Sequence, residues 1–283
     1  MAMSEFTNKI DFEVLVMVKN ANPNGDPLNG NRPRETYDGF GEISDVCIKR
    51  KIRNRLQDMG ENIFVQSDER SDDGCKSLAD RAKSNGVMQK ALKDKDKEAY
   101  AKAACETWID VRSFGQVFAF KDDSVSVGVR GPVSIHSAFS VLPVSIDSMQ
   151  ITKSVNSETK DKKSSDTMGM KHKISSALYV VKGSINHQLA TKTGFSDDDA
   201  EKIKEALRTL FVNDSSSARP DGSMEVCKVY WWRHNCPMGQ YSSAKVHRLV
   251  QITTTADDPK EFEDYDIKVN TLPELILEEI EGI

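Results

Sequence analysis

The densest group of side chains that could bind a ligand lies in the segment 44–55, which reads SDVCIKRKIRNR. Five of the seven residues from 49 to 55 are basic, and no acidic residue interrupts them. On a helix, Lys49, Arg50 and Arg53 share one polar arc, while Lys51 and Arg55 fall on the opposite edge. Three cations on one arc suit the phosphodiester backbone of a nucleic acid. A solvated helix face without a ligand is the alternative interpretation.

A second group of possible nucleic-acid contacts lies in the segment 145–176. Its flanks, SMQITKSV and MGMKHKIS, place flexible apolar side chains beside cations. The apolar residues are Met149, Ile151, Met168 and Met170, and the basic ones are Lys153, Lys171, His172 and Lys173. Such a mixture suits wedging between bases while gripping phosphates. An ordinary surface loop is the alternative.

Patterns of catalytic residues are sparse. The chain has no GxxxxGK[ST] phosphate loop, no GxSxG nucleophile elbow and no HExxH zinc motif. Asp26 and Asp38 precede the basic segment, where a carboxylate could assist metal-dependent RNA cleavage, but an acid in a Gly- and Asn-rich loop also forms turns. Four residues that could bind metal, Cys227, His234, Cys236 and His247, match no common zinc spacing. We therefore expect no metal or other cofactor.

The charge of the chain is distributed unevenly. The net charge of −5 over 283 residues, taken alone, argues against a nucleic-acid partner. However, residues 257–283 hold ten acids and two lysines, which leaves the other 256 residues with a charge of +3. No apolar stretch approaches the roughly 20 residues of a membrane span, and residues 1–9 have no signal-peptide core. With five scattered cysteines, these features predict a cytoplasmic protein without a membrane partner.

The elements that would position these groups begin with a strand at Ile10–Val18, which is apolar on both faces and therefore central in a sheet. Residues 20–34, with five Asn, three Pro and two Gly, predict a loop without helix or strand. Ser44 is the expected N-cap of a helix from Asp45 to about Asp58. The polar residues 61–105 predict a helical insertion rather than a core layer.

The second half of the chain alternates strands with one further helix. We expect short strands at 117–120, 125–129 and 133–135, weak structure over 145–176, and strands at 177–185, 224–232 and 246–252. Ser196 and the three aspartates after it cap a helix with an apolar stripe. This order predicts an α+β fold, most simply a βαββαβ ferredoxin-like core, the topology of RNA-recognition motifs.

Five motifs occur in an order that is specific when they are taken together. They are NPNGDP at 22–27, SDVCIKRKIRN at 44–54, DVRSFGQVF at 110–118, GPVSIHSAFS at 131–140 and GMKHKISSALYV at 169–180. With them the chain resembles the RNA-binding backbone subunit of the CRISPR interference complex Cascade, most closely its subtype I-C form. The motifs cover most of residues 10–190.

This resemblance implies a modified RNA-recognition-motif palm with a helical fingers insertion and a β-hairpin thumb. The palm would comprise residues 1–57, 106–143 and 177–283, the fingers 58–105 and the thumb 144–176, with an acidic C-terminal tail. Several copies would stack head-to-tail along one CRISPR RNA and present it to the target DNA strand, together with other Cascade subunits. No enzymatic activity is implied. Related type III subunits cut RNA with a loop aspartate, so an endonuclease using Asp26 or Asp38 remains the alternative.

The resemblance also implies which residues contact the RNA. Lys49 and Arg53 match the basic helix positions that hold its backbone, with Arg50 as a helper and Ser44 at the helix start. Asn24 and Arg34 lie in the loop that would close over the RNA. In the presumed thumb, the implied contacts are Met149, Ile151, Thr152, Lys153, Lys171 and His172.

Overall fold

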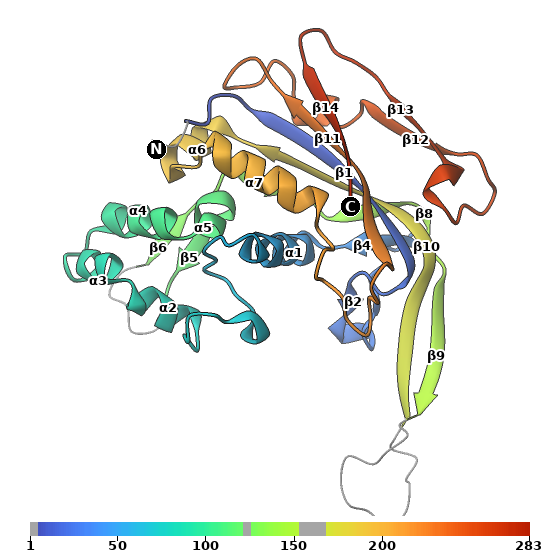
Figure 1. Ribbon diagram of the computed structural model, residues 1–283, viewed down its shortest axis with the longest axis horizontal. Coiled ribbons are helices and arrows are strands. Elements are labelled where there is room, and N and C mark those ends of the chain that lie inside the picture. Colours follow the sequence, from blue (N-terminus) through green and yellow to red (C-terminus); the bar gives the residue numbers. More distant parts are fainter. Residues whose placement is uncertain (1–4, 121–125, 153–167) are drawn as a thin grey trace, which may run out of the picture.

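The computed structural model describes residues 5–120, 126–152 and 168–283 (Figure 1). An eight-stranded sheet, antiparallel in every pairing, forms its centre, with the order β14-β11-β1-β10-β8-β4, and β7 and β9 also pair with β10. The strands are β1 (Ile10–Ala21), β4 (Phe40–Ile43), β7 (Val133–Ile135), β8 (Ala138–Pro143), β9 (Ile146–Thr152), β10 (Met168–Ile185), β11 (Met224–Arg233) and β14 (Ile276–Glu281).

β1 is the middle strand that the sequence predicted. It pairs with β10 along one edge and with β11 along the other. Successive side chains of a strand point to opposite faces, so β1 contributes to two cores. Val14 and Val16 belong to one buried cluster, and Leu15 and Met17 belong to another on the opposite face.

Two helices, α1 (Asp45–Asp58) and α7 (Asp197–Arg208), cover one face of this sheet (Figure 1). Both were predicted, and both are confirmed with their caps. The Ser44 hydroxyl accepts a hydrogen bond from the Cys47 amide at 3.3 Å, and Ser196 and Asp199 form a reciprocal capping box. The apolar stripes of the two helices are buried in the core that also contains Val14 and Val16. This packing fixes the position of the basic face of α1.

The helical insertion has a core of its own, contrary to the prediction of a polar segment outside any core layer. Its elements are α2 (Leu78–Ser84), α3 (Gly86–Lys93), α4 (Lys97–Thr107), α5 (Ile109–Phe114), β5 (Gln116–Phe118) and β6 (Val127–Val129). Phe64, Trp108 and Phe118 pack within it, with the ring centroids of Phe64 and Trp108 4.7 Å apart. Of these three aromatic residues, only Phe64 lies within residues 61–105, and Trp108 and Phe118 follow that range. The composition of 61–105 alone therefore did not reveal the core.

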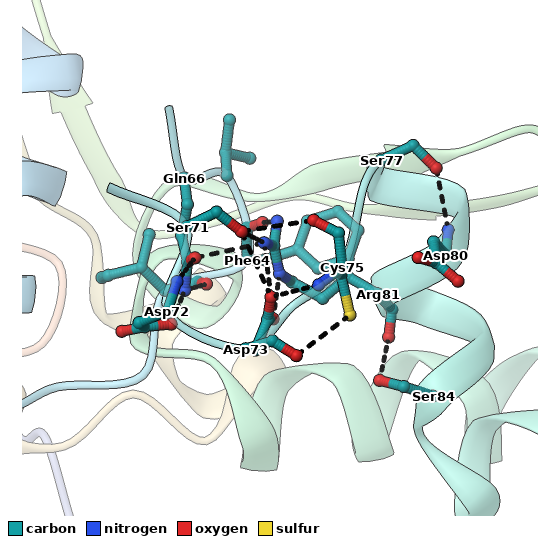
Figure 2. Close-up of polar contacts among 12 residues, drawn as sticks. Phe64, Gln66, Ser71, Asp72, Asp73, Cys75, Ser77, Asp80, Arg81 and Ser84 are labelled. Atoms are coloured by element: carbon teal, nitrogen blue, oxygen red, sulfur yellow. Dashed lines mark hydrogen bonds and ion pairs between the residues drawn. The ribbon is translucent and has the colours of Figure 1, made fainter. Parts of the chain in front are cut away.

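One buried arginine fastens the loop between Phe64 and α2 (Figure 2). Arg81 donates to the Phe64 carbonyl at 2.8 Å and, through two nitrogens, to both carboxylate oxygens of Asp73. Its Nη2 also donates to the Gln66 side chain at 3.1 Å. A planar guanidinium with five donors can hold several loop residues at once. The loop therefore has a defined shape on the side where it faces α1.

The opposite face of the sheet is covered by a small unit built from α8 (Ser243–Val246), β12 (Val250–Thr254) and β13 (Tyr265–Val269). It buries Leu15, Met17 and Trp232. The strand predicted at 246–252 begins only at Val250, because the Ser242 hydroxyl accepts from the Lys245 amide and starts a short helix instead.

The acidic C-terminal segment is part of the fold and not a free tail. β13 pairs with β12, and β14 forms one edge of the main sheet beside β11. Two acids of β14 pair with lysines of neighbouring elements: Lys228 lies 2.6 Å from Glu279, and Lys204 lies 2.8 Å from Glu278. The prediction of an acidic tail was therefore wrong. The sequence of β14 did not reveal a strand, because its few apolar residues lie among acids and are at most partly buried.

Two segments whose composition predicted little regular structure form hairpins, and for the second of them the resemblance implied a hairpin. In the loop 20–34, β2 (Gly25–Asp26) pairs with β3 (Arg32–Pro33) around a short 3-10 turn at Pro27–Asn29. In the segment 145–176, β9 pairs with the first part of β10, which begins at Met168 and not at 177. We call residues 146–152 and 168–174 the arm; they project away from the sheet in Figure 1.

Candidate nucleic-acid interface

The N-terminus of α1 is joined to the loop before it by two residues predicted to bind RNA. The Asn24 side-chain oxygen accepts from both the amide and the hydroxyl of Ser44, each at 2.9 Å. The Ser44 hydroxyl also caps the helix. Both side chains therefore have a structural task, which is to hold the loop 22–27 against the start of α1. Their contact with RNA stays a prediction.

Every basic side chain of α1 is engaged within the chain. Lys49 pairs with Asp45 (2.9 Å), Arg50 donates to the Val65 carbonyl (2.6 Å), Lys51 pairs with Asp214, Arg53 pairs with Asp110 (2.8 Å), and Arg55 donates to the Thr209 hydroxyl (2.7 Å). The sequence shows no acid within the basic run, but Asp45 of the same helix and two distant acids, Asp110 and Asp214, pair with its cations. The helix is thus less positive than its composition indicates.

The Arg53–Asp110 pair has an evident structural role. The Asp110 carboxylate is fully buried and also accepts from the amides of Phe64 and Val65, at 2.7 and 3.1 Å. The pair therefore connects α1 to α5 and to the start of the second core. Lys49 differs, because its partner Asp45 is a partly exposed residue one turn away on the same helix.

A cavity of about 610 Å³ opens along the other side of α1. Cys47, Arg50, Lys51 and Asn54 line it at positions i, i+3, i+4 and i+7, so they share one helix face. The remaining lining residues are Ser67, Glu69, Arg70, Asn213, Asp214, Ser215, Ser216 and Arg219. Four cations and two carboxylates therefore surround the cavity. The helix α1 therefore presents cations on two sides: Arg50 and Lys51 toward this cavity, and Lys49 outside it.

Residues 213–219, which we call the serine loop, form the wall opposite α1. Ser216 and Arg219 exchange backbone hydrogen bonds of 2.8 and 3.1 Å, and the Ala218 carbonyl accepts from the Asn22 amide at 2.9 Å. The loop is thereby attached to the chain that leaves β1. The sequence showed only a turn here. Neither Arg219 nor Arg70 could be recognised as part of a site, because the residues that complete it are distant in sequence.

The arm separates the residues predicted to wedge between bases. Side chains of directly opposed residues lie on the same face of an antiparallel pair. Met149 opposes Lys171 and Ile151 opposes Gly169, so these side chains share one face. Thr152 opposes Met168 and Ser148 opposes His172, which places these residues and Met170 on the other face. Met149, Ile151, Met168 and Met170 are each between 40% and 55% exposed, so both faces present apolar surface.

A second cavity, of about 290 Å³, lies where the arm meets the loop 22–31 and the serine loop. Lys171 and His172 line it together with Ile151 and Met170. The Arg32 side chain and the His172 ring both reach the Ser148 hydroxyl, at 2.9 and 2.8 Å, which fixes the arm to the loop. Of the predicted arm residues, Lys153 lies outside the described part of the chain.

The candidate carboxylates for RNA cleavage have ordinary places in turns. Asp26 accepts from the Leu28 amide at 3.1 Å and caps the 3-10 turn. Arg34 lies 3.6 Å from the same carboxylate, and its Nε is buried without a hydrogen bond. Asp38 lies in the turn between β3 and β4, which is closed by the Thr36 hydroxyl and carbonyl.

Both histidines considered for metal binding are hydrogen-bonded to other groups of the fold, and Cys227 and Cys236 are free thiols. His234 bonds to Asp11 at 2.8 Å, and His247 bonds to the Gly183 carbonyl at 3.0 Å. Over residues 5–120, 126–152 and 168–283, no three His, Cys, Asp or Glu residues are arranged to hold a metal ion.

A family model described as CRISPR-associated protein Cas7 matches residues 8–270 of this sequence. The chain belongs to the Cas7 family. A CRISPR-associated protein Cas7 from Haloferax volcanii is 35% identical over 116 residues, which are 40% of this chain and 33% of that protein. The alignment thus spans about a third of that relative, and the Cas7 family assignment depends on the longer match.

Solved structures of CRISPR complexes contain chains of similar fold. One, from a CRISPR RNA-guided surveillance complex in a pre-nicking state, has a TM-score of 0.50 and 16% identity, covering 83% of this chain and 81% of its own. Another surveillance-complex chain has a TM-score of 0.45 and 16% identity, over 82% and 72% of the two chains. The first similarity shows a shared mixed α/β fold with a large antiparallel sheet. None of the helices in the described ranges is long and apolar enough to cross a membrane.

Proposed function

We propose that this Cas7 family member is a non-catalytic CRISPR RNA-binding backbone subunit of a type I-C Cascade complex. Several copies would assemble along one guide RNA and present it for pairing with target DNA. The observation that carries the proposal is the Cas7 match over residues 8–270 in a chain whose α1 borders a cation-lined cavity. The projecting arm, apolar on both faces, supports it.

We also propose that the sheet is the palm of a modified RNA-recognition motif. The strand order β11-β1-β10-β8, antiparallel throughout, is the order expected for a βαββαβ core whose second and third strands are β8 and β10. α1 and α7, the two helices of such a core, pack together on one face. The insertion with its own core would be the fingers, and the arm would belong to the thumb.

In this function the protein grips the RNA backbone and base pairing reads the sequence. Contacts between unlike surfaces of successive copies give an open filament when the rotation between copies does not close, and in such a filament RNA length would set the number of copies. Masses of complexes formed on RNAs of increasing length should therefore rise in steps of one subunit. A dimer or ring of constant mass on all RNAs would contradict this assembly.

The direct test is to purify the tagged protein from cells that express a CRISPR array and the other Cascade subunits. We expect a co-purifying RNA of discrete length that stays intact when magnesium is added. Lys49→Ala should reduce the recovered RNA, whereas Lys93→Ala, the same change at the end of α3, should not. Bulk cellular RNA of all lengths, or no RNA, would refute the function, and magnesium-dependent cleavage would favour the endonuclease alternative.

A further inference from the structure

At the edge of the cavity beside α1, two cations share one carboxylate. Asp214 bonds to the Lys51 ammonium, and the Arg219 Nε lies 3.4 Å from the same Asp214 oxygen. The three side chains are 4%, 13% and 27% exposed for Lys51, Asp214 and Arg219. The cluster therefore has one positive charge in excess in a place that is largely shielded from water.

Arg219 lacks hydrogen-bond acceptors. Within the described residues, no hydrogen bond from its side chain is found, and its Nε is buried without an acceptor. A guanidinium has five N–H donors, and a buried donor without a partner destabilises the folded protein. The distance to Asp214 gives attraction between charges but no hydrogen bond. The Arg219 guanidinium can therefore donate to acceptor oxygens of a bound ligand.

The surroundings of Arg219 offer further free donors. The Ser67 hydroxyl lines the cavity and is also buried without a partner. Ser215 and Ser216 contribute hydroxyls from the serine loop. The other two arginines of the cavity are already used, because Arg50 bonds to the Val65 carbonyl and Arg70 lies 2.7 Å from Asp58. The unused donors and the excess charge both match a phosphate.

We propose that this cavity binds a phosphate of the guide RNA backbone, with Arg219 as the phosphate-binding residue and Asp214 as an internal counter-ion that holds Arg219 and Lys51 until the phosphate enters. The proposal rests on the proposed function. It concerns the side of α1 that faces the serine loop, and not the Lys49 side indicated by the sequence.

The charges explain why the exchange is favourable. A phosphodiester carries one negative charge, which balances the one charge in excess. Arg219 would replace its 3.4 Å pair with charge-assisted hydrogen bonds to phosphate oxygens, while Lys51 keeps its bond to Asp214. The Asp214 carboxylate remains near the phosphate and repels it. One subunit therefore binds a short RNA less tightly than its cations alone would allow, and tight binding needs contacts repeated along the RNA.

The test measures the affinity of the full-length protein for a labelled single-stranded RNA at several salt concentrations. Arg219→Gln should bind about tenfold more weakly, with a salt slope flatter by roughly one unit. Asp214→Asn should bind about fivefold more tightly, because it removes the repulsion. Asp257→Asn makes the same charge change at an exposed residue between β12 and β13, on the opposite face of the sheet, and should stay within about twofold of wild type. Thermal melting checks that each variant is folded.

The outcomes separate the two proposals. If the wild type binds no RNA, the proposed function fails, and this inference fails with it. If the wild type binds but folded Arg219→Gln matches it in affinity and salt slope, only this inference is wrong. Inorganic phosphate is the second probe. A rise in melting temperature with phosphate that Arg219→Gln abolishes, together with unchanged RNA binding, would show a site for a free anion and overturn the assignment to RNA.

Discussion

At the residue scale, the cations of α1 differ in how far water reaches them. The Lys49 side chain is 25% exposed and pairs with Asp45, which is 38% exposed. The Arg53 side chain is 13% exposed and pairs with fully buried Asp110. Solvent-exposed ion pairs add little to stability, whereas removing one partner of a buried pair leaves an uncompensated charge. The two cations therefore differ in structural role: the Arg53 pair is buried in the fold, and the Lys49 pair is partly open to solvent.

Arg53→Ala should therefore lower the free energy of unfolding by roughly 2–4 kcal/mol, because the Asp110 carboxylate loses its cation. Lys49→Ala, the matched removal of a cation one turn away, should change it by less than about 1 kcal/mol. Denaturant unfolding of both variants measures the difference. Equal unfolding midpoints for the two would show that the Asp110 pair does not hold α1 to the second core.

Another buried residue, Glu13 in β1, makes stability depend on pH. Its Oε2 has no hydrogen bond, and the Lys182 ammonium lies 3.9 Å away. Burial raises the pKa of Glu13 to about 8, partly offset by Lys182. The folded protein thus keeps a proton that the unfolded chain releases near pH 4.5. Stability from this group is complete below that pH and is lost as the pH rises toward 8.

Glu13→Gln should remove this dependence, since the amide does not titrate. Between pH 5 and 8 the wild type should lose on the order of 1–3 kcal/mol more stability than the variant. Melting temperatures at a series of pH values provide the measurement, with Glu225→Gln, an exposed residue of β11, as the control. Parallel pH profiles for wild type and Glu13→Gln would mean that Glu13 is ionised in the folded protein.

At the scale of elements, the arm is a two-faced hairpin. Met149, Ile151 and Lys171 lie on one face, and Met168 and Met170 lie on the other. Lys171 has no hydrogen-bond or ion-pair partner among the described residues, whereas His172 on the opposite face is held by Ser148. A free cation beside apolar side chains suits contact with RNA. The two faces are therefore available for different partners.

Serine substitutions on each face test this division. Met149→Ser with Ile151→Ser should weaken RNA binding several-fold, and Met168→Ser with Met170→Ser should affect it less. Both double variants should melt near the wild-type temperature, because all four side chains are exposed. RNA affinity and self-association are measured for each. A larger loss of RNA affinity for the methionine pair of β10 would assign the faces the other way round.

Local signals predicted elements better than they predicted the site. Ser44 and Ser196 could be recognised from the sequence as N-caps, because an N-cap side chain bonds to amides only two or three residues further along the chain. The extension of β10 back to Met168 comes from its pairing with β9, which the polar residues at its start do not reveal. The Arg219 cluster escaped prediction because Lys51 and Asp214 are 163 positions apart. A single sequence does not show which residues far apart along the chain come into contact in the fold.

At the scale of the whole molecule, the C-terminal segment completes both faces of the sheet. β14 pairs with β11 over six residues. Ile280 packs against the core under α1 and α7, while Leu277 packs against the core under β12 and β13. The three glutamates of β14 pair with one lysine of α7 and one of β11. The acids of this strand are thus partly balanced by cations of the two elements beside it.

Truncation before Ile276 should consequently destabilise the protein, on the order of 3 kcal/mol, through loss of apolar burial and of an edge strand. The control keeps the strand and makes the same change in side-chain charge, with glutamines at Glu278, Glu279 and Glu281. It should cost much less, since these side chains are about half exposed or more. Melting of both variants decides between them. A truncated protein as stable as the wild type would show that β14 does not contribute to the stability of the sheet.

The place of β1 between β10 and β11 has a consequence for biosynthesis. This strand of 12 residues ends at Ala21, but its partner β11 ends only at Arg233. At roughly 5–20 residues per second, a ribosome needs about 10–40 s to make the intervening chain. Its other partner, β10, is complete at Ile185, so β1 lacks both neighbours for most of that time and lacks β11 throughout it. We therefore expect the amount of folded protein obtained from a cell to depend on chaperones that bind the exposed β1 segment, independently of the stability of the finished sheet.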